Sequence, residues 1–312
     1  MNLKVKELWE EAREPFSLEL EAGGEGFDNE ILERAINRPG LALTGFFQYF
    51  AFRRLQVFGL AEFTYMKSLG GPERNRRLRQ FCQRRVPAIV LARNRHAPDE
   101  LRALADEFRI PVMRTPMITS LFINECTVLI EDLTAPRRRV QGTMLDMMGI
   151  GVMIRGAAGI GKSETALTLI ERGYSLVSDD VTELRRLASG RLVGSASELT
   201  RYHMEIRGLG IIHVPSLYGV SSIRGECPLD LVIDLVKPGS EKAGRGEENG
   251  PDEIELLEAR VPRVELPVMP GRDMANIVEA TALNQKLKFM GHDAAKELDE
   301  KLVTALQRRS VR

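Results

Sequence analysis

The chain has 312 residues, of which 43% are hydrophobic and 28% charged, close to the average of soluble globular proteins. This composition excludes a disordered chain, a collagen-like repeat and a disulfide-stapled miniprotein. Because 44 basic residues balance 44 acidic ones, the chain lacks the basic excess with which proteins grip duplex nucleic acid, and we expect no nucleic-acid partner.

The first part of the chain, residues 1–134, is predicted to form a small α/β domain. Its strands are expected at 86–94 and 110–115, and its helices at 98–108 and 120–133. This strand–helix–strand–helix order predicts a partly parallel sheet. The segment APRRR (135–139) is interpreted as an exposed, extended linker, after which a second domain, 135–312, begins.

Eight arginines lie between residues 74 and 95, where no acidic residue occurs. One interpretation is a docking patch for an acidic or phosphorylated partner. The other is a solvated face whose counter-charges come from elsewhere in the fold. We favour the second, since such clusters are common on helices and loops.

The cysteines and the apolar runs bear on the cellular compartment. Cys82, Cys126 and Cys227 lie far apart without metal-ligand spacing, and we expect them to be buried thiols in a reducing compartment. No run of about 18 apolar residues is long enough for a membrane span. The charged N-terminal stretch, residues 1–15, lacks the apolar core of a signal peptide. We therefore expect a cytoplasmic protein without a membrane partner.

The strongest motif is GAAGIGKS (156–163), which matches the P-loop pattern G-x-x-x-x-G-K-[ST]. A strand is predicted before it at 150–154 and a helix after it at 162–172. The glycines let backbone N–H groups turn inward around phosphate oxygens, and the helix N-terminus adds positive potential. Lys162 reaches the outer phosphates, and Ser163 offers a hydroxyl ligand to Mg²⁺. The residues predicted to bind the nucleotide phosphates are Gly156, Ala157, Ala158, Gly159, Ile160, Gly161, Lys162 and Ser163.

A P-loop protein also needs a carboxylate near the metal, and two predicted strands lead into one. The strand at 174–178 leads into Asp179 and Asp180, and the strand at 231–233 leads into Asp234. A right-handed crossover would place Asp180 beside the P-loop strand, so we favour Asp180 and interpret Asp234 as structural.

Two further segments follow. In the string MEIRGLGII (204–212), Glu205 could bind a metal or have a structural role, and the residues favour neither.

Residues 239–252 are rich in glycine and charge and predict a long loop. Residues 273–308 predict two helices separated at Gly291.

Four segments, in order along the chain, resemble the bacterial HPr kinase/phosphorylase family. Two of them are GAAGIGKSETALTLIERGYSLVSDDV (156–181) and MEIRGLGIIHV (204–214). The other two are INRPGLALTGFFQYFAFRRLQVFGLAEFTYM (36–66) and LPVMPGRDMANIVEATALNQKLKFMGHDAA (266–295). The resemblance therefore extends over both predicted domains.

This resemblance implies a fold and an activity. The fold would be α/β, with a small N-terminal α/β domain and a C-terminal P-loop kinase core resembling phosphoenolpyruvate carboxykinase. Family members are homohexamers that use ATP and Mg²⁺ to phosphorylate a serine of the phosphocarrier protein HPr or a paralogue, in the regulation of carbon metabolism. Most also reverse the reaction with inorganic phosphate and release pyrophosphate.

The resemblance also implies roles for single residues. Lys162 would be catalytic, and Ser163 and Glu205 would bind Mg²⁺. Asp180 would be the general base that takes the seryl proton and, protonated, the acid of the reverse reaction. Arg245 best matches the catalytic arginine of the family, which offsets charge in the transition state.

The sequence departs from the family at three positions. Gln141 stands where the family usually has a histidine, and it remains a candidate catalytic residue that hydrogen-bonds phosphate without titrating. Met269 stands where a lysine or arginine is usual, in the loop 267–272 that serves the phosphorylase direction. His213 replaces a small acidic residue, and we interpret it as packed. We expect weak phosphorylase activity, because positive charge is lost.

Two other functions stay open from the sequence. The first is a P-loop kinase that acts on a small molecule, for which the same motif would serve. The second is a catalytically degenerate, nucleotide-sensing family member, which Gln141 and Met269 suggest. The retention of Lys162, Asp180 and Glu205 argues against the second.

Overall fold

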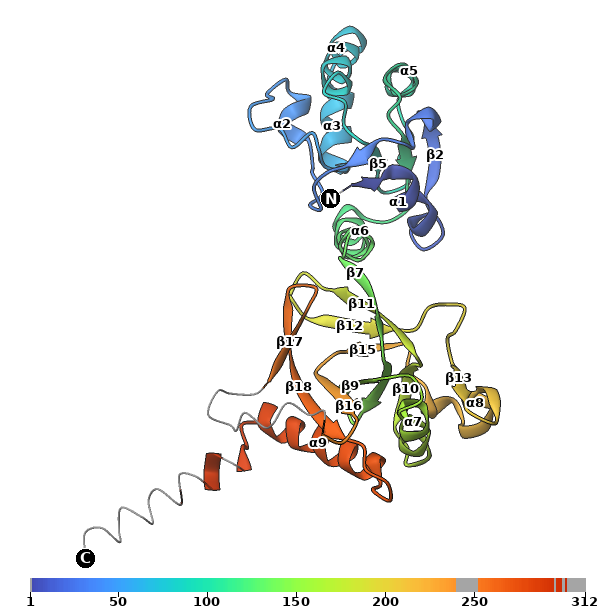
Figure 1. Ribbon diagram of the computed structural model, residues 1–312. Coiled ribbons are helices and arrows are strands. Elements are labelled where there is room, and N and C mark those ends of the chain that lie inside the picture. Colours follow the sequence, from blue (N-terminus) through green and yellow to red (C-terminus); the bar gives the residue numbers. More distant parts are fainter. Residues whose placement is uncertain (1, 240–251, 295, 299–300, 302–312) are drawn as a thin grey trace, which may run out of the picture. The chain divides into compact units, whose positions relative to one another are not determined.

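A computed structural model of the chain describes residues 2–239, 252–294, 296–298 and 301. The chain divides into two compact units, Met1–Ala135 and Pro136–Arg312 (Figure 1). Among the described residues, no helix combines the length and the apolar character that a membrane crossing requires.

The first unit is built on a four-stranded sheet in the order β2-β6-β5-β4, with a separate β1–β3 pair. Its strands are β1 Leu3–Lys4, β2 Glu19–Ala22, β3 Glu30–Ile31, β4 Gln56–Phe58, β5 Ile89–Leu91 and β6 Val112–Arg114. Its helices are α1 Val5–Ala12, α2 Gly40–Leu43, α3 Leu60–Ser68, α4 Gly71–Cys82, α5 Asp99–Phe108 and α6 Thr119–Leu133, with a 3₁₀ turn at Gly24–Gly26. Strands β4, β5 and β6 are parallel and β2 is antiparallel, which confirms the predicted partly parallel sheet.

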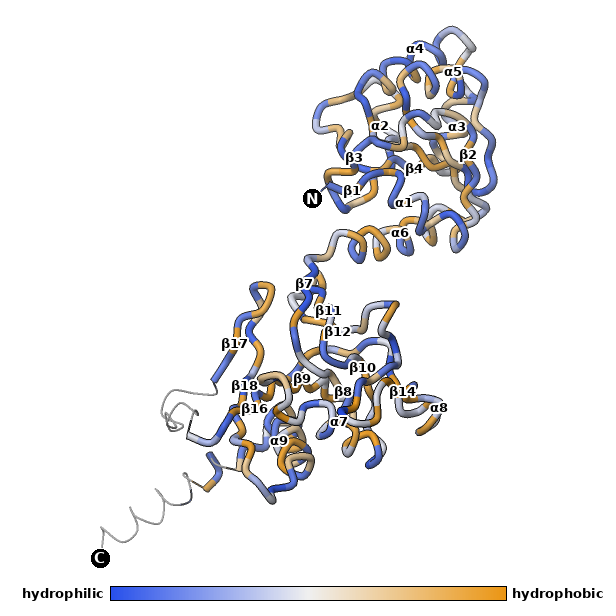
Figure 2. Tube along the Cα trace, turned by 45° about the vertical axis from the view of Figure 1, so that its right-hand side comes forward, coloured by the Kyte–Doolittle hydropathy of each residue, from blue (hydrophilic) through white to orange (hydrophobic). Residues whose placement is uncertain are grey.

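The central strands of this sheet are buried on both faces, because side chains alternate along a strand. Val57, Val90 and Met113 belong to one core, which includes residues of α1 and α6. Phe58 and Leu91 belong to the other, which includes residues of α3, α4 and α5. Both helices expected from the sequence after residue 98, at 98–108 and 120–133, are present as α5 and α6. Figure 2 shows the apolar stretches running through the middle of this unit.

Four of the eight arginines of the 74–95 cluster lie on α4, and their counter-charges come from α5 and from the start of α4. Arg74 pairs with Glu100 and Arg79 with Glu107, both on α5. Glu73 accepts from two further arginines of α4 itself. For these four arginines of α4, the interpretation as a solvated face whose charges are balanced by acidic residues of the fold is confirmed.

The second unit has a six-stranded sheet in the order β10-β8-β9-β16-β18-β17, a four-stranded sheet in the order β15-β12-β11-β7, and the hairpin β13–β14. Its first strands are β7 Arg137–Gln141, β8 Thr143–Met147, β9 Ile150–Gly156, β10 Ser175–Ser178, β11 Val181–Arg186 and β12 Leu192–Ser195. They are followed by β13 His203–Ile206, β14 Gly210–His213, β15 Glu226–Pro228, β16 Leu231–Val236, β17 Glu253–Leu256 and β18 Ala259–Pro267. The helices are α7 Lys162–Glu171, α8 Val214–Tyr218 and α9 Met274–Phe289, with a 3₁₀ turn at Val220–Ser222.

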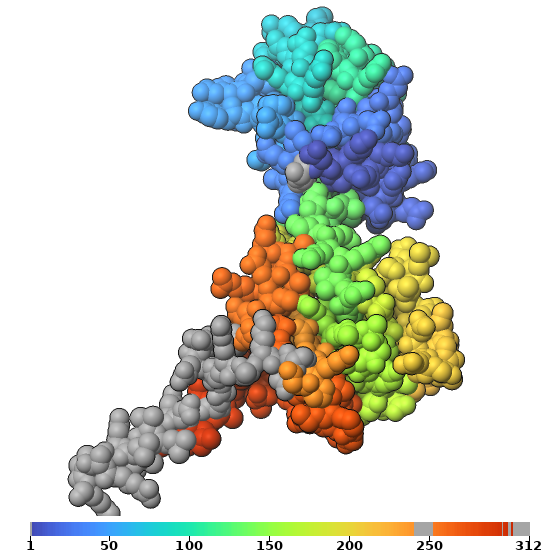
Figure 3. Space-filling model, viewed as in Figure 1, coloured from blue at the N-terminus to red at the C-terminus, as the bar shows by residue number. Residues whose placement is uncertain are grey.

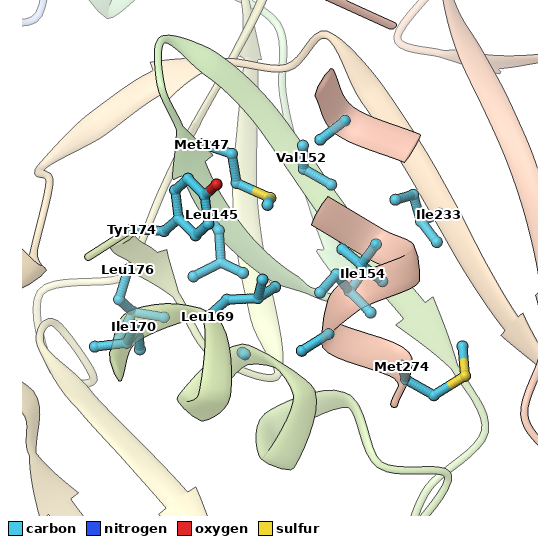
Figure 4. Close-up of a cluster of buried hydrophobic side chains, with 14 of the residues drawn as sticks. Leu145, Met147, Val152, Ile154, Leu169, Ile170, Tyr174, Leu176, Ile233 and Met274 are labelled. Atoms are coloured by element: carbon cyan, nitrogen blue, oxygen red, sulfur yellow. The ribbon is translucent and has the colours of Figure 1, made fainter. Parts of the chain in front are cut away.

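Two cores hold this unit together, one on each face of the six-stranded sheet. On one face, side chains of β8, β9 and β16 gather with those of α7 and α9, as Figure 4 shows for Ile154, Leu169 and Met274. On the other face, Met153 of β9 and Val232 of β16 join a core with residues of β11 and β12. The unit therefore has a helical layer, a central sheet and a second sheet.

Two expectations from the sequence were wrong here. Residues 137–139 of the segment expected as a linker, 135–139, belong instead to strand β7, because the backbone pairs with β11 from Arg137 to Gln141. Strand β10 lies beside β8 rather than beside β9, the strand before the glycine loop, because β8 is the hairpin partner of β9 and occupies that position. Of the two expected C-terminal helices, the first is α9, and most of the second lies outside the described residues.

All three cysteines are buried and free, which confirms the expectation of buried thiols. Burial raises the pKa of each of these thiols to about 12. They therefore stay protonated at neutral pH, and we assign them to packing rather than to chemistry.

Candidate active site

The candidate site lies at one edge of the six-stranded sheet, where several strands end together. Strands β9, β16 and β18 are parallel, and the register pairs Leu235 with Gly156 and Val236 with Pro267. Three segments therefore leave the sheet at this edge: the loop that begins at Gly156, the chain after Val236, and the loop that contains Met269. Loops at the carboxyl ends of parallel strands are where ligands bind in α/β sheets.

The segment from Gly156 to Ser163 connects β9 directly to α7, which confirms the predicted strand–loop–helix. At Gly156, a Cβ atom would lie 2.7 Å from the carbonyl oxygen of Leu235, so the close approach of two strand ends requires glycine. Gly161, immediately before α7, has a φ of 104°, in the left-handed region that favours glycine. The N-terminus of α7, with its free N–H groups and positive potential, therefore opens onto the loop.

Two cationic side chains lie at this loop. The Lys162 ammonium donates to the carbonyl oxygens of Gly156 and Ala157, at 3.2 and 3.3 Å. The second is Arg207, in the turn between β13 and β14, whose guanidinium lies beside Gly159. Its Nη1 atom is 3.8 Å from the point where a Cβ atom would stand if residue 159 had one. The loop thus combines inward-turning backbone with two positive charges, which suits a polyphosphate.

The carboxylate of Asp179, directly after β10, connects three segments of the site. It accepts from the hydroxyl of Ser163 at 3.1 Å, from the hydroxyl of Thr143 at 2.7 Å, and from the backbone N–H of Glu205 at 3.2 Å. Asp179 therefore joins the hydroxyl of Ser163 to the backbone of the strand that carries Glu205.

The donor set around Asp179 fits a magnesium ion. Hydroxyl and carboxylate oxygens are the ligands that Mg²⁺ prefers, and this ion usually keeps several waters and substrate phosphates in its shell. In the part of the chain that the structure describes, no group of three or more His, Cys, Asp and Glu is arranged to hold a metal. A magnesium ion with only two or three oxygen ligands from the chain, and with phosphate and water in its other positions, agrees with this ligand preference. It also agrees with the absence of a larger cluster of metal-ligating residues in the described part of the chain.

Asp180 and Gln141 lie next to each other at the rim of this site. The ladder between β7 and β11 pairs Gln141 with Val181, and the N–H of Gly142 donates to the carbonyl of Asp180 at 2.8 Å. Asp180 has a φ of 59° and an exposed side chain. The two residues predicted from the sequence for proton transfer and phosphate contact thus lie on neighbouring stretches of backbone.

The remaining predicted residues have different outcomes. Asp234 is buried and ion-paired with Arg155 at 3.2 Å and with Arg263 at 2.5 Å, in agreement with the structural role expected for it. His213 is exposed on β14 rather than packed, so that expectation was wrong: strand alternation turns its neighbour Ile212 inward instead. Arg245 lies outside the described residues, and its role stays a prediction.

Sequence reasoning missed the part that Asp179, Thr143 and Arg207 play in this geometry. The position of Asp179 as the first residue after an apolar strand was visible, but the left-handed turn at Asp180 decides which carboxylate turns toward Ser163. Thr143 carries no local signal, because it reaches the site only through the pairing of β8 with β9 and β10.

We expect Asp179→Asn to raise the Mg²⁺ concentration needed for half-maximal nucleotide binding by about tenfold, since a charge-assisted hydrogen bond contributes roughly 1.5–3 kcal/mol. The asparagine side chain has one oxygen acceptor instead of two. Its NH₂ group would face the hydroxyl and N–H donors that now donate to Asp179, so at least one of these hydrogen bonds is lost. Fluorescence titration of a labelled nucleotide at several Mg²⁺ concentrations measures the effect. An unchanged Mg²⁺ requirement would contradict this role of Asp179.

Comparison with known proteins gives a consistent result over the length of the chain. The family model "HPr Serine kinase N terminus" matches residues 3–130, and "HPr Serine kinase C-terminal domain" matches residues 132–302. The chain is 40% identical over 296 residues to an HPr kinase/phosphorylase from Leptospira biflexa, covering 94% of this chain and 92% of that protein. It is 37% identical to one from Bacillus pumilus, with 94% and 95% covered. Among solved structures, the Hpr(Ser) kinase/phosphatase from Coxiella burnetii matches with a TM-score of 0.47 and 33% identity, over 52% of this chain and 98% of that one.

Proposed function

The chain belongs to the HPr serine kinase family, and on this premise we propose that it is an HPr kinase/phosphorylase dependent on ATP and Mg²⁺. In the forward direction, it transfers the terminal phosphoryl group of ATP to a serine hydroxyl of HPr or a paralogue. In the reverse direction, inorganic phosphate takes the phosphoryl group from phosphoserine, and pyrophosphate leaves. The observation that carries the proposal is that the Ser163 hydroxyl and the backbone N–H of Glu205 both donate to Asp179 beside the glycine loop.

We assign the catalysis to the second domain, residues 135–312, as a P-loop kinase core of the phosphoenolpyruvate carboxykinase type. The strand–loop–helix of β9, Gly156–Ser163 and α7 supports this assignment. In it, the loop N–H groups and Lys162 bind the outer phosphates of ATP.

Ser163 and Glu205 are proposed as the protein ligands of Mg²⁺, with Asp179 holding the Ser163 hydroxyl in place. The ion, when bound, supplies positive charge to the phosphate oxygens during transfer. Arg207, beside Gly159, adds a guanidinium to the same region, and Arg245 is the further arginine we propose to offset charge in the transition state.

Asp180 is proposed as the general base. Its exposed carboxylate at the rim is accessible to a protein substrate, and it takes the proton from the attacking serine hydroxyl. In the reverse reaction, the protonated Asp180 returns this proton to the leaving serine oxygen, because the same transition state is crossed in the opposite direction. The neighbouring Gln141 is proposed to hydrogen-bond the incoming phosphate.

We expect the reverse reaction to be weak, and the double change Met269→Lys with Gln141→His to raise the phosphorolysis rate more than the kinase rate. A phosphate ion must be brought next to phosphoserine against like-charge repulsion, and added cations at this edge offset it. Met269 is 42% exposed, so a lysine there has room to extend into solvent. The check is release of pyrophosphate from phosphorylated HPr at millimolar phosphate. Equal and vigorous rates of both reactions in the unmodified protein would contradict the expectation.

The proposed function is tested by incubating the protein with HPr, ATP and Mg²⁺, and measuring phosphoserine by mass spectrometry. HPr with the acceptor serine replaced by alanine is the substrate control. Phosphorylation of a small molecule but not of HPr would favour the small-molecule kinase instead. Nucleotide binding without transfer to any acceptor would favour the nucleotide-sensing alternative.

We further propose that the protein is a homohexamer and that it lies in the cytoplasm. Native mass spectrometry measures the number of subunits.

A further inference from the structure

Two histidines face each other on the hairpin β13–β14, outside the groups used in the proposed reaction. The register pairs His203 directly with His213, and their ring centroids are 5.0 Å apart. Both side chains are exposed, while Met204 and Ile212 of the same strands turn inward and are buried. Figure 3 shows the chain segment around residues 200–220, coloured yellow, at the surface of the second unit.

Each imidazole ring makes a hydrogen bond through Nδ1, which leaves Nε2 available to bind a ligand. His203 Nδ1 is 2.9 Å from the carbonyl oxygen of Arg201. A carbonyl only accepts, so Nδ1 of His203 carries the proton and Nε2 carries the lone pair. His213 Nδ1 is 2.7 Å from the hydroxyl of Ser216, which is able to accept in the same way. Metal-binding histidines are oriented by such contacts of the second ring nitrogen, typically to a backbone carbonyl or another acceptor.

We propose that His203 and His213 form a binding site for a divalent transition-metal ion, ligated by the Nε2 atoms of both rings. Two imidazoles bound to one tetrahedral ion at about 2.0–2.1 Å have ring centres roughly 5 Å apart, which agrees with the spacing in the hairpin. Zn²⁺, Ni²⁺, Cu²⁺ and Co²⁺ accept imidazole nitrogen, whereas Mg²⁺ prefers oxygen. The site is therefore chemically distinct from the one proposed for Mg²⁺.

The site consists of two protein ligands and open positions. Across the described residues, no third His, Cys, Asp or Glu completes a metal-binding group, so water fills the remaining positions of the ion. Because the two histidines come from opposite strands, a bound ion joins β13 to β14 at the end away from their turn. Glu205 follows His203 by two residues on the same outward face. A metal at the histidine pair therefore stabilises the segment that carries Glu205.

The test is isothermal titration calorimetry of Ni²⁺ and Zn²⁺ into the full chain without an affinity tag. We expect one ion per chain, and weaker binding by about tenfold or more in each of His203→Gln and His213→Gln, since the second ligand binds as an intramolecular step. The matched control is His292→Gln, which removes another exposed histidine of the same unit and is expected to leave the affinity unchanged. Ser163→Ala, which alters the proposed Mg²⁺ site, is expected to retain Ni²⁺ binding.

A second measurement uses the unmodified protein and so does not depend on how the variants fold. In the unmodified protein, Zn²⁺ is expected to shift the Nε2 resonances of His203 and His213 in long-range ¹H–¹⁵N spectra, with those of His96 and His292 unmoved. Absence of binding, an affinity in both histidine variants equal to that of the unmodified protein, or shifts confined to the other histidines would each overturn the proposal. None of these outcomes depends on transfer of phosphate to HPr, so the proposed function is tested separately.

Discussion

Replacement of Asp180 by asparagine is expected to lower phosphoryl transfer to HPr by about a hundredfold or more, the usual contribution of a positioned general base. Asparagine has nearly the same shape and keeps the backbone contact from Gly142 to residue 180. It is unable to take the seryl proton. Affinity for ATP should stay within about twofold of the unmodified protein, because Asp180 does not belong to the glycine loop.

The measurement is the single-turnover rate of HPr phosphorylation, with nucleotide affinity measured in parallel. Asp179→Asn is the matched control, since it makes the same chemical change one residue away. There the defect should show mainly in the Mg²⁺ requirement, because Asp179 contacts Ser163 and the backbone of Glu205. Full transfer activity in Asp180→Asn would make this aspartate a turn residue and remove it from the mechanism.

Replacement of Lys162 by alanine is expected to weaken Mg²⁺–ATP binding by more than tenfold. One charge-assisted contact to phosphate contributes roughly 1.5–3 kcal/mol, and Lys162 holds its ammonium at the carbonyls of Gly156 and Ala157, inside the loop. The fold should be unaffected, because α7 is anchored by Ala166 and Leu169 in the core rather than by its first residue.

Equilibrium titration with ATP measures the change, and circular dichroism checks the fold. Lys67→Ala removes the same charge from an exposed position on α3 of the first unit, and is expected to leave ATP affinity unchanged. If ATP binds Lys162→Ala as tightly as the unmodified protein, the segment 156–163 does not act as a phosphate-binding loop.

The two variants separate binding from chemistry. Loss of Lys162 should reduce the population of the nucleotide complex, whereas loss of Asp180 should leave this complex in place and stop the transfer from it. A protein that only senses nucleotide would respond to the first change and be indifferent to the second.

Some residues were identified from the sequence because their signal is local. The glycine loop with Lys162 and Ser163 needs only fixed spacing between an apolar strand and a helix, and both are present. The helix α5 is encoded in the same way, by apolar residues at helical spacing. The order of four family-like segments also pointed to the family, which the match of both family models now shows.

Other features depend on which strands pair, and no local pattern encodes this. Residues 137–139 have the composition of a linker, yet they lie in strand β7 because their backbone pairs with β11. Because β8 and β9 pair as a hairpin, β10 lies on the far side of β8 and not beside β9.

The candidate site shows the same division between local and long-range determinants. The sequence by itself determined the loop between β9 and α7 and the pair of aspartates after the next strand, because these follow from neighbours in the chain. Only the tertiary structure decided that Asp179 contacts Ser163 and Glu205, and that His203 faces His213. The reason is physical: strand register and a left-handed turn fix where a side chain points, and both arise from hydrogen bonds between segments far apart in the sequence.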